Sequence, residues 1–181
     1  LQEAGIFYYF KHEDGQHTLV LGDSPSAIKP AADEDAVYTA GSHKDKCITR
    51  WTRGYSVYTG QVTHTDYNYQ TPDTSLPAQQ QGQATARIAQ NYERYHYPGL
   101  YQDHGDGQTL ADQHLDALQV SYDTSEGESN YASFGAGTKF TFTNPPNEAD
   151  EDHYAIISVM HDAIDNSYLH GSTGNQSYHN I

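Results

Sequence analysis

The first 23 residues follow the pattern of a β-hairpin. Apolar runs at residues 6–10 and 18–21 flank a turn at residues 13–15, where glycine adopts a positive φ at little cost. Both runs are apolar at consecutive positions and not only at alternate ones. The pattern therefore predicts a hairpin over residues 6–23 with both of its faces covered, which implies a larger sheet or a helix layer above it.

A second strand-rich stretch follows a polar interval. Residues 24–45 are rich in proline, alanine and acidic residues, which predicts a loop. Over residues 48–69 the pattern changes, because Tyr55 and Val57 alternate with other residues and Gly60 marks a bend. Two or more strands are expected there.

One amphipathic helix is predicted near residues 110–122. Thr109 and Asp112 form a weak capping box. Four residues recur on one helical face: Ala111, Leu115, Leu118 and Tyr122. The Gln/Ala-rich residues 76–90 before the helix indicate a surface loop or a short helix, and residues 124–130 break the helix.

The last third of the chain has the pattern of strands. Phe140 and Phe142 share one face of the segment KFTFTN, and residues 154–163, apolar on both faces, are the best candidate for a central strand. Aspartate at Ile157 or Val159 is then expected to unfold the protein. The predicted core consists of Trp51, Tyr55, Val57, Phe140, Phe142, Ile156 and Val159. The fold class that follows is β-rich α+β with one amphipathic helix.

Charge and composition exclude some partners. The chain carries 9 Lys+Arg against 24 Asp+Glu, a formal net charge of -15, so nucleic acid and anionic membranes are poor partners. No apolar run approaches the roughly 20 residues that span a bilayer, so no membrane insertion is expected. The single cysteine, Cys47, is expected to be a buried or incidental thiol. No signal peptide is visible. Because the chain does not begin with Met and its opening LQEAGIFYYF enters directly into an apolar run, we expect an excised piece of a longer protein.

The stretch HDAIDNSY, residues 161–168, concentrates side chains able to bind a metal or move a proton: His161, Asp162, Asp165, Asn166 and Ser167. In a strand, the first two of these point to opposite faces. The last three fall where the strand exits into a turn, and such side chains hydrogen-bond the local backbone there. A structural interpretation is preferred over a site.

The other histidines follow no zinc-binding pattern, and no HExxH motif occurs. They are His12, His17, His43, His64, His96, His104, His114, His153, His170 and His179. His12 and His17 are expected to face each other across the hairpin, where a fortuitous surface metal site is the alternative to a structural role. No dedicated metal site and no cofactor are expected.

The acidic residues do not suggest a glycoside hydrolase, whose acid needs an apolar environment. Six of them lie in hydrophilic clusters: Glu13, Asp14, Glu148, Asp150, Glu151 and Asp152. The sequence also lacks GxSxG, a P-loop and a dinucleotide-binding glycine motif. We therefore expect no catalytic residues and no enzymatic activity.

Several segments, taken in order, resemble the VgrG family, the spike proteins of the type VI secretion system. They are LQEAGIFYYFKHEDGQHTLVLGDSPSA, ITRWTRGYSVYTGQVTHTDYNYQTP, YHYPGLY, the LADQHLDAL helix, GAGTKFTFTNPP and YAIISVMHDAIDNSY. They correspond to the gp27-like hub region, which is also related to phage baseplate hub and late control D proteins. The resemblance omits roughly residues 30–44 and 79–91.

The resemblance implies a homotrimeric hub whose subunits each contribute two tube-forming β-barrels, presented to the Hcp-like tube ring and the baseplate. It assigns residues 1–45 to the end of an inter-barrel domain and residues 46–181 to the second barrel. It also implies that the OB-like domain and the needle lie outside this chain. It further implies assembly in the bacterial cytoplasm followed by secretion, with no catalysis by this region.

A rival hypothesis starts from the 16 tyrosines, which stand beside 5 Phe and 1 Trp. Tyrosine is suited to half-exposed strands and subunit interfaces, but also to sugar-binding platforms. A secreted carbohydrate-binding or carbohydrate-active β-domain is therefore an alternative, with Tyr95, Tyr97 and Tyr101 stacking on sugars. A second alternative is the hub of a phage tail or another contractile injection machine.

Overall fold

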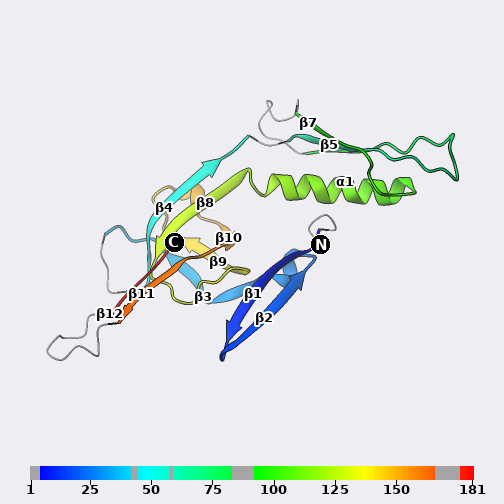
Figure 1. The fold of residues 1–181 in the computed structure, drawn as a ribbon. Coiled ribbons are helices and arrows are strands. Elements are labelled where there is room, and N and C mark those ends of the chain that lie inside the picture. The colour runs from blue at the N-terminus through cyan, green and yellow to red at the C-terminus, as the bar shows by residue number, and fades with distance from the viewer. Residues whose placement is uncertain (1–4, 42–44, 58, 83–91, 166–175) are drawn as a thin grey trace. The chain divides into compact units, whose positions relative to one another are not determined.

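The chain forms two compact units, each assembled from segments that are distant in sequence (Figure 1). The computed structural model describes residues 5–41, 45–57, 59–82, 92–165 and 176–181. The first unit comprises the described parts of residues 1–6 and 54–124, and the second those of residues 7–53 and 125–181. These bounds do not coincide with the predicted division at residue 45, and the assignment of barrel and inter-barrel domains stays a prediction.

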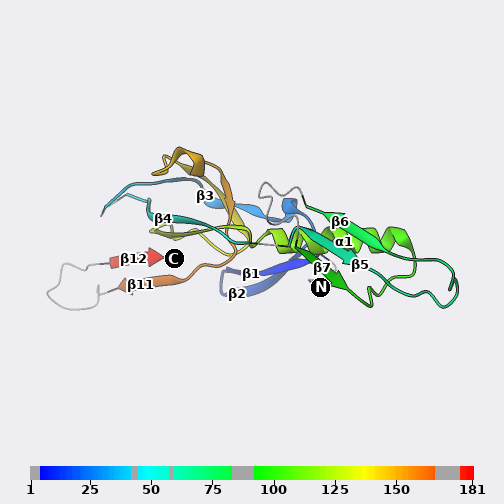
Figure 2. The ribbon, with the colours of Figure 1, turned by 90° about the horizontal axis from the view of Figure 1, so that it is seen from above.

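The first unit is a helix packed on a small sheet. Strand β5 (Gln61–His64) lies between β6 (Ala78–Gln81), to which it is antiparallel, and β7 (Glu93–His96), to which it is parallel. Helix α1 (His104–Gln119) packs against β5 and β6 (Figures 1 and 2). Val62 of the sheet is fully buried, as is Ala111 of the helix, so the two elements share an apolar interface.

The helix confirms part of the predicted apolar face, but it begins and ends earlier than predicted, so Tyr122 lies beyond its end. Its N-cap is Asp103, whose carboxylate accepts a hydrogen bond from the Asp106 backbone N–H at 3.0 Å. Thr109, the predicted cap, instead donates its hydroxyl to the Gly105 carbonyl inside the helix. The predicted capping box is therefore wrong, because an aspartate six residues upstream satisfies the free backbone donors first. Ala111 and Leu115 are buried as expected.

The Gln/Ala-rich segment before the helix is a strand in part. Residues 78–81 form β6 at the edge of the sheet, so the predicted loop or short helix is wrong there. Gln108 of α1 donates its side-chain amide to the Gln79 carbonyl at 3.1 Å and holds the strand against the helix. The remainder of the stretch, residues 83–90, lies outside the described residues.

The second unit contains a two-stranded hairpin, a three-stranded sheet and most of a four-stranded sheet. In the three-stranded sheet, β9 (Thr138–Thr143) lies between β10 (His153–Ala155) and β3 (Lys29–Val37). The four-stranded sheet has the order β11 (His161–Asp165), β12 (Gln176–Asn180), β8 (Asp123–Ser129), β4 (Ile48–Tyr55). Two short 3-10 helices, Pro25–Ala27 and Glu148–Asp150, connect elements.

An aromatic cluster forms the core of the second unit. Phe142 is completely buried, and the ring of Trp51 lies 4.4 Å from it, centroid to centroid. Phe140, Phe134 and Tyr131 complete the buried rings of this cluster. The prediction that Trp51, Phe140, Phe142 and Ile156 belong to the core is confirmed, Trp51 and Ile156 being only partly buried.

Two predicted elements of this unit are wrong. The expected loop at residues 24–45 contains β3, which pairs in parallel with β9 and buries Ala31 and Ala36 against the aromatic cluster. The segment was predicted to be a loop because it is acidic and the inward-facing residues of its strand are small alanines. Residues 124–130, expected only to break the helix, likewise lie largely in β8.

The predicted central strand at residues 154–163 is also wrong. It is divided between β10 and β11, which lie at the edges of two different sheets, and residues 156–160 connect them. Ile157 in this connection is 70% exposed, so aspartate there has no buried environment to oppose it. Tyr55 and Val57 are exposed as well, and were assigned to the core because alternation alone does not say which face is covered.

The hairpin is confirmed in position and register. Strands β1 (Phe7–Glu13) and β2 (Gln16–Gly22) are joined at Asp14 and Gly15, both with positive φ. The inner face of the hairpin packs closely against Gly137, which has a φ of 82°. A Cβ at Gly137 would clash with the ring of Tyr9. The outer face is about half exposed, so the expected coverage of both faces is wrong within this chain.

No sheet among the described residues closes on itself, and the predicted tube barrel is not confirmed by this chain alone. Nor does the described part of the chain contain a helix with the length and apolarity needed to cross a membrane.

Replacing Phe142 with alanine should lower the free energy of unfolding by about 3–5 kcal/mol, because it leaves a cavity in the aromatic cluster. Ile157→Asp, in contrast, should change it by less than about 1 kcal/mol. Denaturant unfolding followed by the fluorescence of Trp51, the only tryptophan, measures both. A large loss in Ile157→Asp would restore the central-strand hypothesis.

Candidate functional site

The first unit brings three histidines together from three elements. His64 of β5 is directly opposite His96 of β7 in the parallel register, and His114 of α1 reaches them from the helix. The ring centroids of His64 and His96 are 4.9 Å apart, and that of His114 lies 4.7 Å from His64 and 5.4 Å from His96. One nitrogen from each ring lies within 4.8 Å of the other two. We call this group the histidine cluster.

The environment of the histidine cluster favours neutral imidazoles. His64 is only 2% exposed, and neither of its ring nitrogens has a hydrogen-bond partner among the described residues. Burial lowers its pKa, and the neighbouring His114 and His96 lower it further. Burial also lowers the pKa of His96, again with a contribution from His114. A neutral imidazole has a free lone pair, which is the form that coordinates metal ions.

Sequence reasoning missed the histidine cluster because its members are far apart in the chain and follow no known spacing. A weaker signal was present. His114 lies between Ala111 and Leu115 on the apolar face of the helix, where a polar ring needs an explanation. His64 lies two residues after the buried Val62 on the same strand, so both side chains point to the same side of the sheet.

The described residues of HDAIDNSY belong to the second unit, whereas the histidine cluster belongs to the first. His161, Asp162 and Asp165 lie in β11, and all three are exposed. The His161 ring instead forms a hydrogen bond with the Tyr178 hydroxyl on the paired strand β12. Asn166 and Ser167 lie outside the described residues.

The pair predicted across the hairpin is confirmed. His12 and His17 are register partners in β1 and β2, and their ring centroids are 4.7 Å apart. Both side chains are exposed, in contrast to His64. Two exposed rings supply fewer ligands than a structural metal site uses.

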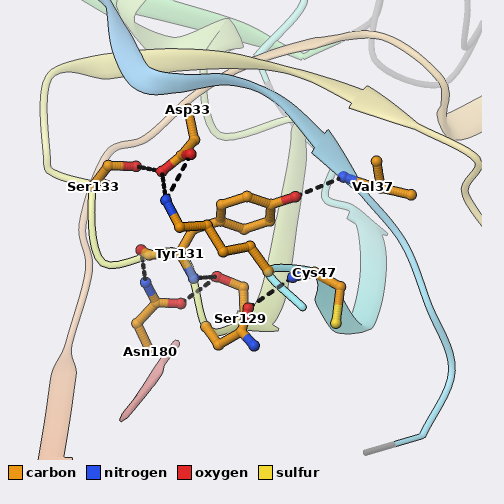
Figure 3. Close-up of polar contacts among 9 residues, drawn as sticks. Asp33, Val37, Cys47, Ser129, Tyr131, Ser133 and Asn180 are labelled. Atoms are coloured by element: carbon orange, nitrogen blue, oxygen red, sulfur yellow. Dashed lines mark hydrogen bonds and ion pairs between the residues drawn. The ribbon is translucent and has the colours of Figure 1, made fainter. Parts of the chain in front are cut away.

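Polar residues gather in a second place, between β3 and the segment after β8 (Figure 3). Asp33 accepts two hydrogen bonds from Lys46 Nζ at 2.8 Å and one from the Ser133 hydroxyl at 2.6 Å. The Tyr131 hydroxyl accepts from the backbone N–H of Val37 at 3.1 Å. The Ser133 and Tyr131 contacts tie β3 to residues that are 100 and 94 positions away in the chain.

The same region links the C-terminal strand to the core. Ser129 donates its hydroxyl to the side-chain oxygen of Asn180, and the Asn180 amide donates to the Tyr131 carbonyl at 2.8 Å (Figure 3). Cys47 is buried, as predicted, and its backbone N–H donates to Asn130. Ser129 donates to an amide oxygen, which is not a base, and Ser133 donates to the Asp33 carboxylate, whose pKa is lowered by the Lys46 ammonium and by Ser133 itself. The arrangement therefore positions segments and does not activate a nucleophile.

The tyrosines proposed to stack on sugars do not share one surface. Tyr95 and Tyr97 are exposed, but Tyr101 is buried and donates its hydroxyl to the Leu76 carbonyl. Its ring lies against Gly99 and Gly107, where a Cβ would clash with it. Tyr101 is therefore part of the core of the first unit.

A more continuous apolar surface lies on the hairpin. Its outer face carries four alternate side chains that are each about half exposed: Tyr8, Phe10, Leu19 and Leu21. Tyr8 and Leu21 are register partners, and so are Phe10 and Leu19, so the four form one contiguous patch. We call it the outer hairpin face.

Comparison with known proteins gives a consistent result. The chain matches the phage tail baseplate hub (GPD) family over residues 1–167. It is 27% identical over 178 residues to the type VI secretion system spike protein VgrG1a of Pseudomonas aeruginosa, a match that covers 96% of this chain and 28% of that protein. It is 28% identical to VgrG1c of the same organism, with 96% and 24% covered.

A third relative carries a different description. The actin cross-linking toxin VgrG1 of Vibrio cholerae is 27% identical over 183 residues, which cover 98% of this chain and 17% of that protein. The chain thus spans less than a third of the length of each of these relatives.

Replacing Asp33 with asparagine tests the polar region. The Lys46 ammonium and the Ser133 hydroxyl lower the pKa of Asp33, so its contribution is present above the ordinary carboxyl pKa of about 3.9 and is lost as the pH falls through the lowered value. The variant should melt about 2 °C lower at pH 7, and the difference should shrink below about pH 4. Asp35→Asn, an exposed position on the same strand, is the matched control. Equal losses in both variants would contradict this role.

Proposed function

The chain belongs to the phage tail baseplate hub family, and from this membership we propose that it is a structural hub segment of a VgrG-type spike that docks on the Hcp-like tube ring. The family match over residues 1–167 carries the proposal, because it covers the hairpin, the helix and all but the last strand. The relatives named as type VI spike proteins support the same role.

The role proposed is mechanical. In the assembled spike, three copies would form the hub, and each would complete its tube-forming barrel at residues 46–181 next to the inter-barrel part at residues 1–45. The strands would then present a rigid collar to the tube ring and the baseplate. Assembly would occur in the bacterial cytoplasm, before export to the extracellular space or a target cell.

We propose that a second copy of the chain covers the outer hairpin face. Four large apolar side chains at half exposure form a patch that subunit interfaces use, and aromatic residues are enriched in such contacts. The chain's net charge of -15 opposes association, so an apolar contact would have to supply the attraction between copies. A partner on this face would also explain why both strands of the hairpin are apolar at consecutive positions.

No catalysis is proposed for this segment. The polar groups in Figure 3 are engaged in pairing chain segments, and neither the Ser129 nor the Ser133 hydroxyl there is an activated nucleophile. The toxin name of one relative belongs to a protein of which the match covers 17%, so it assigns no activity to this chain. The family description also suits the hub of a phage tail or another contractile injection machine. The identity of the tube ring protein that co-purifies with the chain would distinguish these machines from a type VI system.

Leu19→Asp on the outer hairpin face should abolish association between copies, because it places a charge in an apolar contact. In the protein that contains this sequence, sedimentation should shift from trimer to monomer, and co-purification of the tube ring should fall about tenfold or more. Val57→Asp, at a position 78% exposed outside the hairpin, is the matched control.

Two outcomes would contradict the proposal. If Leu19→Asp leaves the trimer and ring capture intact, the outer hairpin face is not the subunit interface. If the unsubstituted protein captures no tube ring but is retained on a polysaccharide column, the hub role itself is wrong.

A further inference from the structure

The histidine cluster has the composition of a metal centre, and the hub role proposed above does not use it. Three imidazoles is the ligand set of several zinc sites, in which a water or another ligand takes the fourth position. His64 arises from the middle strand of the sheet, His96 from an edge strand and His114 from the helix that covers the sheet. Each therefore comes from a different element of the first unit.

The burial of His64 is the independent observation. A fully buried ring whose two nitrogens both lack a partner leaves a donor and an acceptor unsatisfied, which is unusual in native proteins. The rings of His96 and His114 both lie against the His64 ring. Neither of them forms a hydrogen bond with it. A bound cation would give one of these nitrogens a partner.

We propose that His64, His96 and His114 bind one divalent transition-metal ion, zinc in the first instance, which fastens helix α1 to strands β5 and β7. Imidazole ligands suit Zn²⁺ and its neighbours in the first transition row, whereas Mg²⁺ and Ca²⁺ prefer oxygen.

The distances require a modest closure on binding. One nitrogen from each ring lies within 4.8 Å of the others, whereas Zn–N bonds of about 2.0–2.1 Å in a tetrahedron bring ligand nitrogens to about 3.4 Å. His96 and His114 are only partly buried, so rotation of their side chains would bring the nitrogens together. The ion would thereby hold an edge strand and the helix to the buried middle strand.

The test uses this chain after treatment with a chelator, in a His12→Ala/His17→Ala background that removes the exposed histidine pair. Titration with Zn²⁺ by calorimetry should give one ion per chain, and Co²⁺ should give the visible absorption of a tetrahedral site. Mg²⁺ should give neither. The melting temperature should rise with Zn²⁺.

Matched substitutions on one helix identify the ligands. His114→Gln should weaken Zn²⁺ binding about 100-fold or more, while His104→Gln, at an exposed position of α1, should leave it unchanged. His96→Asn, on strand β7, is the second ligand variant, and because neither His96 nor His114 is fully buried, both variants are expected to fold. Far-UV circular dichroism without metal checks this.

Absence of Zn²⁺ binding in the His12→Ala/His17→Ala background would overturn the proposal. So would equal affinity for the unsubstituted chain and a folded His114→Gln or His96→Asn variant, since the ion would then bind adventitiously elsewhere. This test is independent of tube docking, and its failure would leave the hub role untouched.

Discussion

The packing of Phe142 against Trp51 is the contact on which the second unit depends. These two rings join β9 to β4, and Tyr154 of β10 packs on the Trp51 ring from a third strand. Around them the chain has few large apolar residues to bury, since its mean hydropathy is -0.83. Burial of aromatic rings supplies the largest apolar area per side chain, so one cluster is able to organise strands that are otherwise polar. The polar contacts of Asp33, Tyr131 and Asn180 then hold strands β3 and β12 to the segment that follows β8.

This arrangement explains which elements could be predicted from the sequence. The hairpin has a local turn signal at Gly15, and the helix has a regular apolar face at Ala111 and Leu115, so both were predicted close to their observed positions. Strand β3 was missed because its inward residues are alanines among acids, and its pairing with β9 is parallel and remote in sequence. No local pattern contains that information.

The errors in the predicted core have a related cause. Tyr55, Val57 and Ile157 are apolar and lie in strand-like sequence, yet all three are exposed. Periodicity says which residues share a face but not whether another element covers that face. The histidine cluster shows the same limit for function, because only the parallel pairing of β5 with β7 and the packing of α1 bring His64, His96 and His114 together. For a hub segment, exposed apolar strands are also what assembly with other copies requires.

The central claim is that this chain is a hub segment whose outer hairpin face is covered by a neighbouring copy. The most direct measurement is an electron cryomicroscopy map of the assembled spike that contains this sequence. We expect three copies around one axis, with Phe10 and Leu19 buried against the adjacent subunit and the tube ring stacked on the hub. A map in which the chain occurs as a single copy, or in which the outer hairpin face is open to solvent, would contradict it.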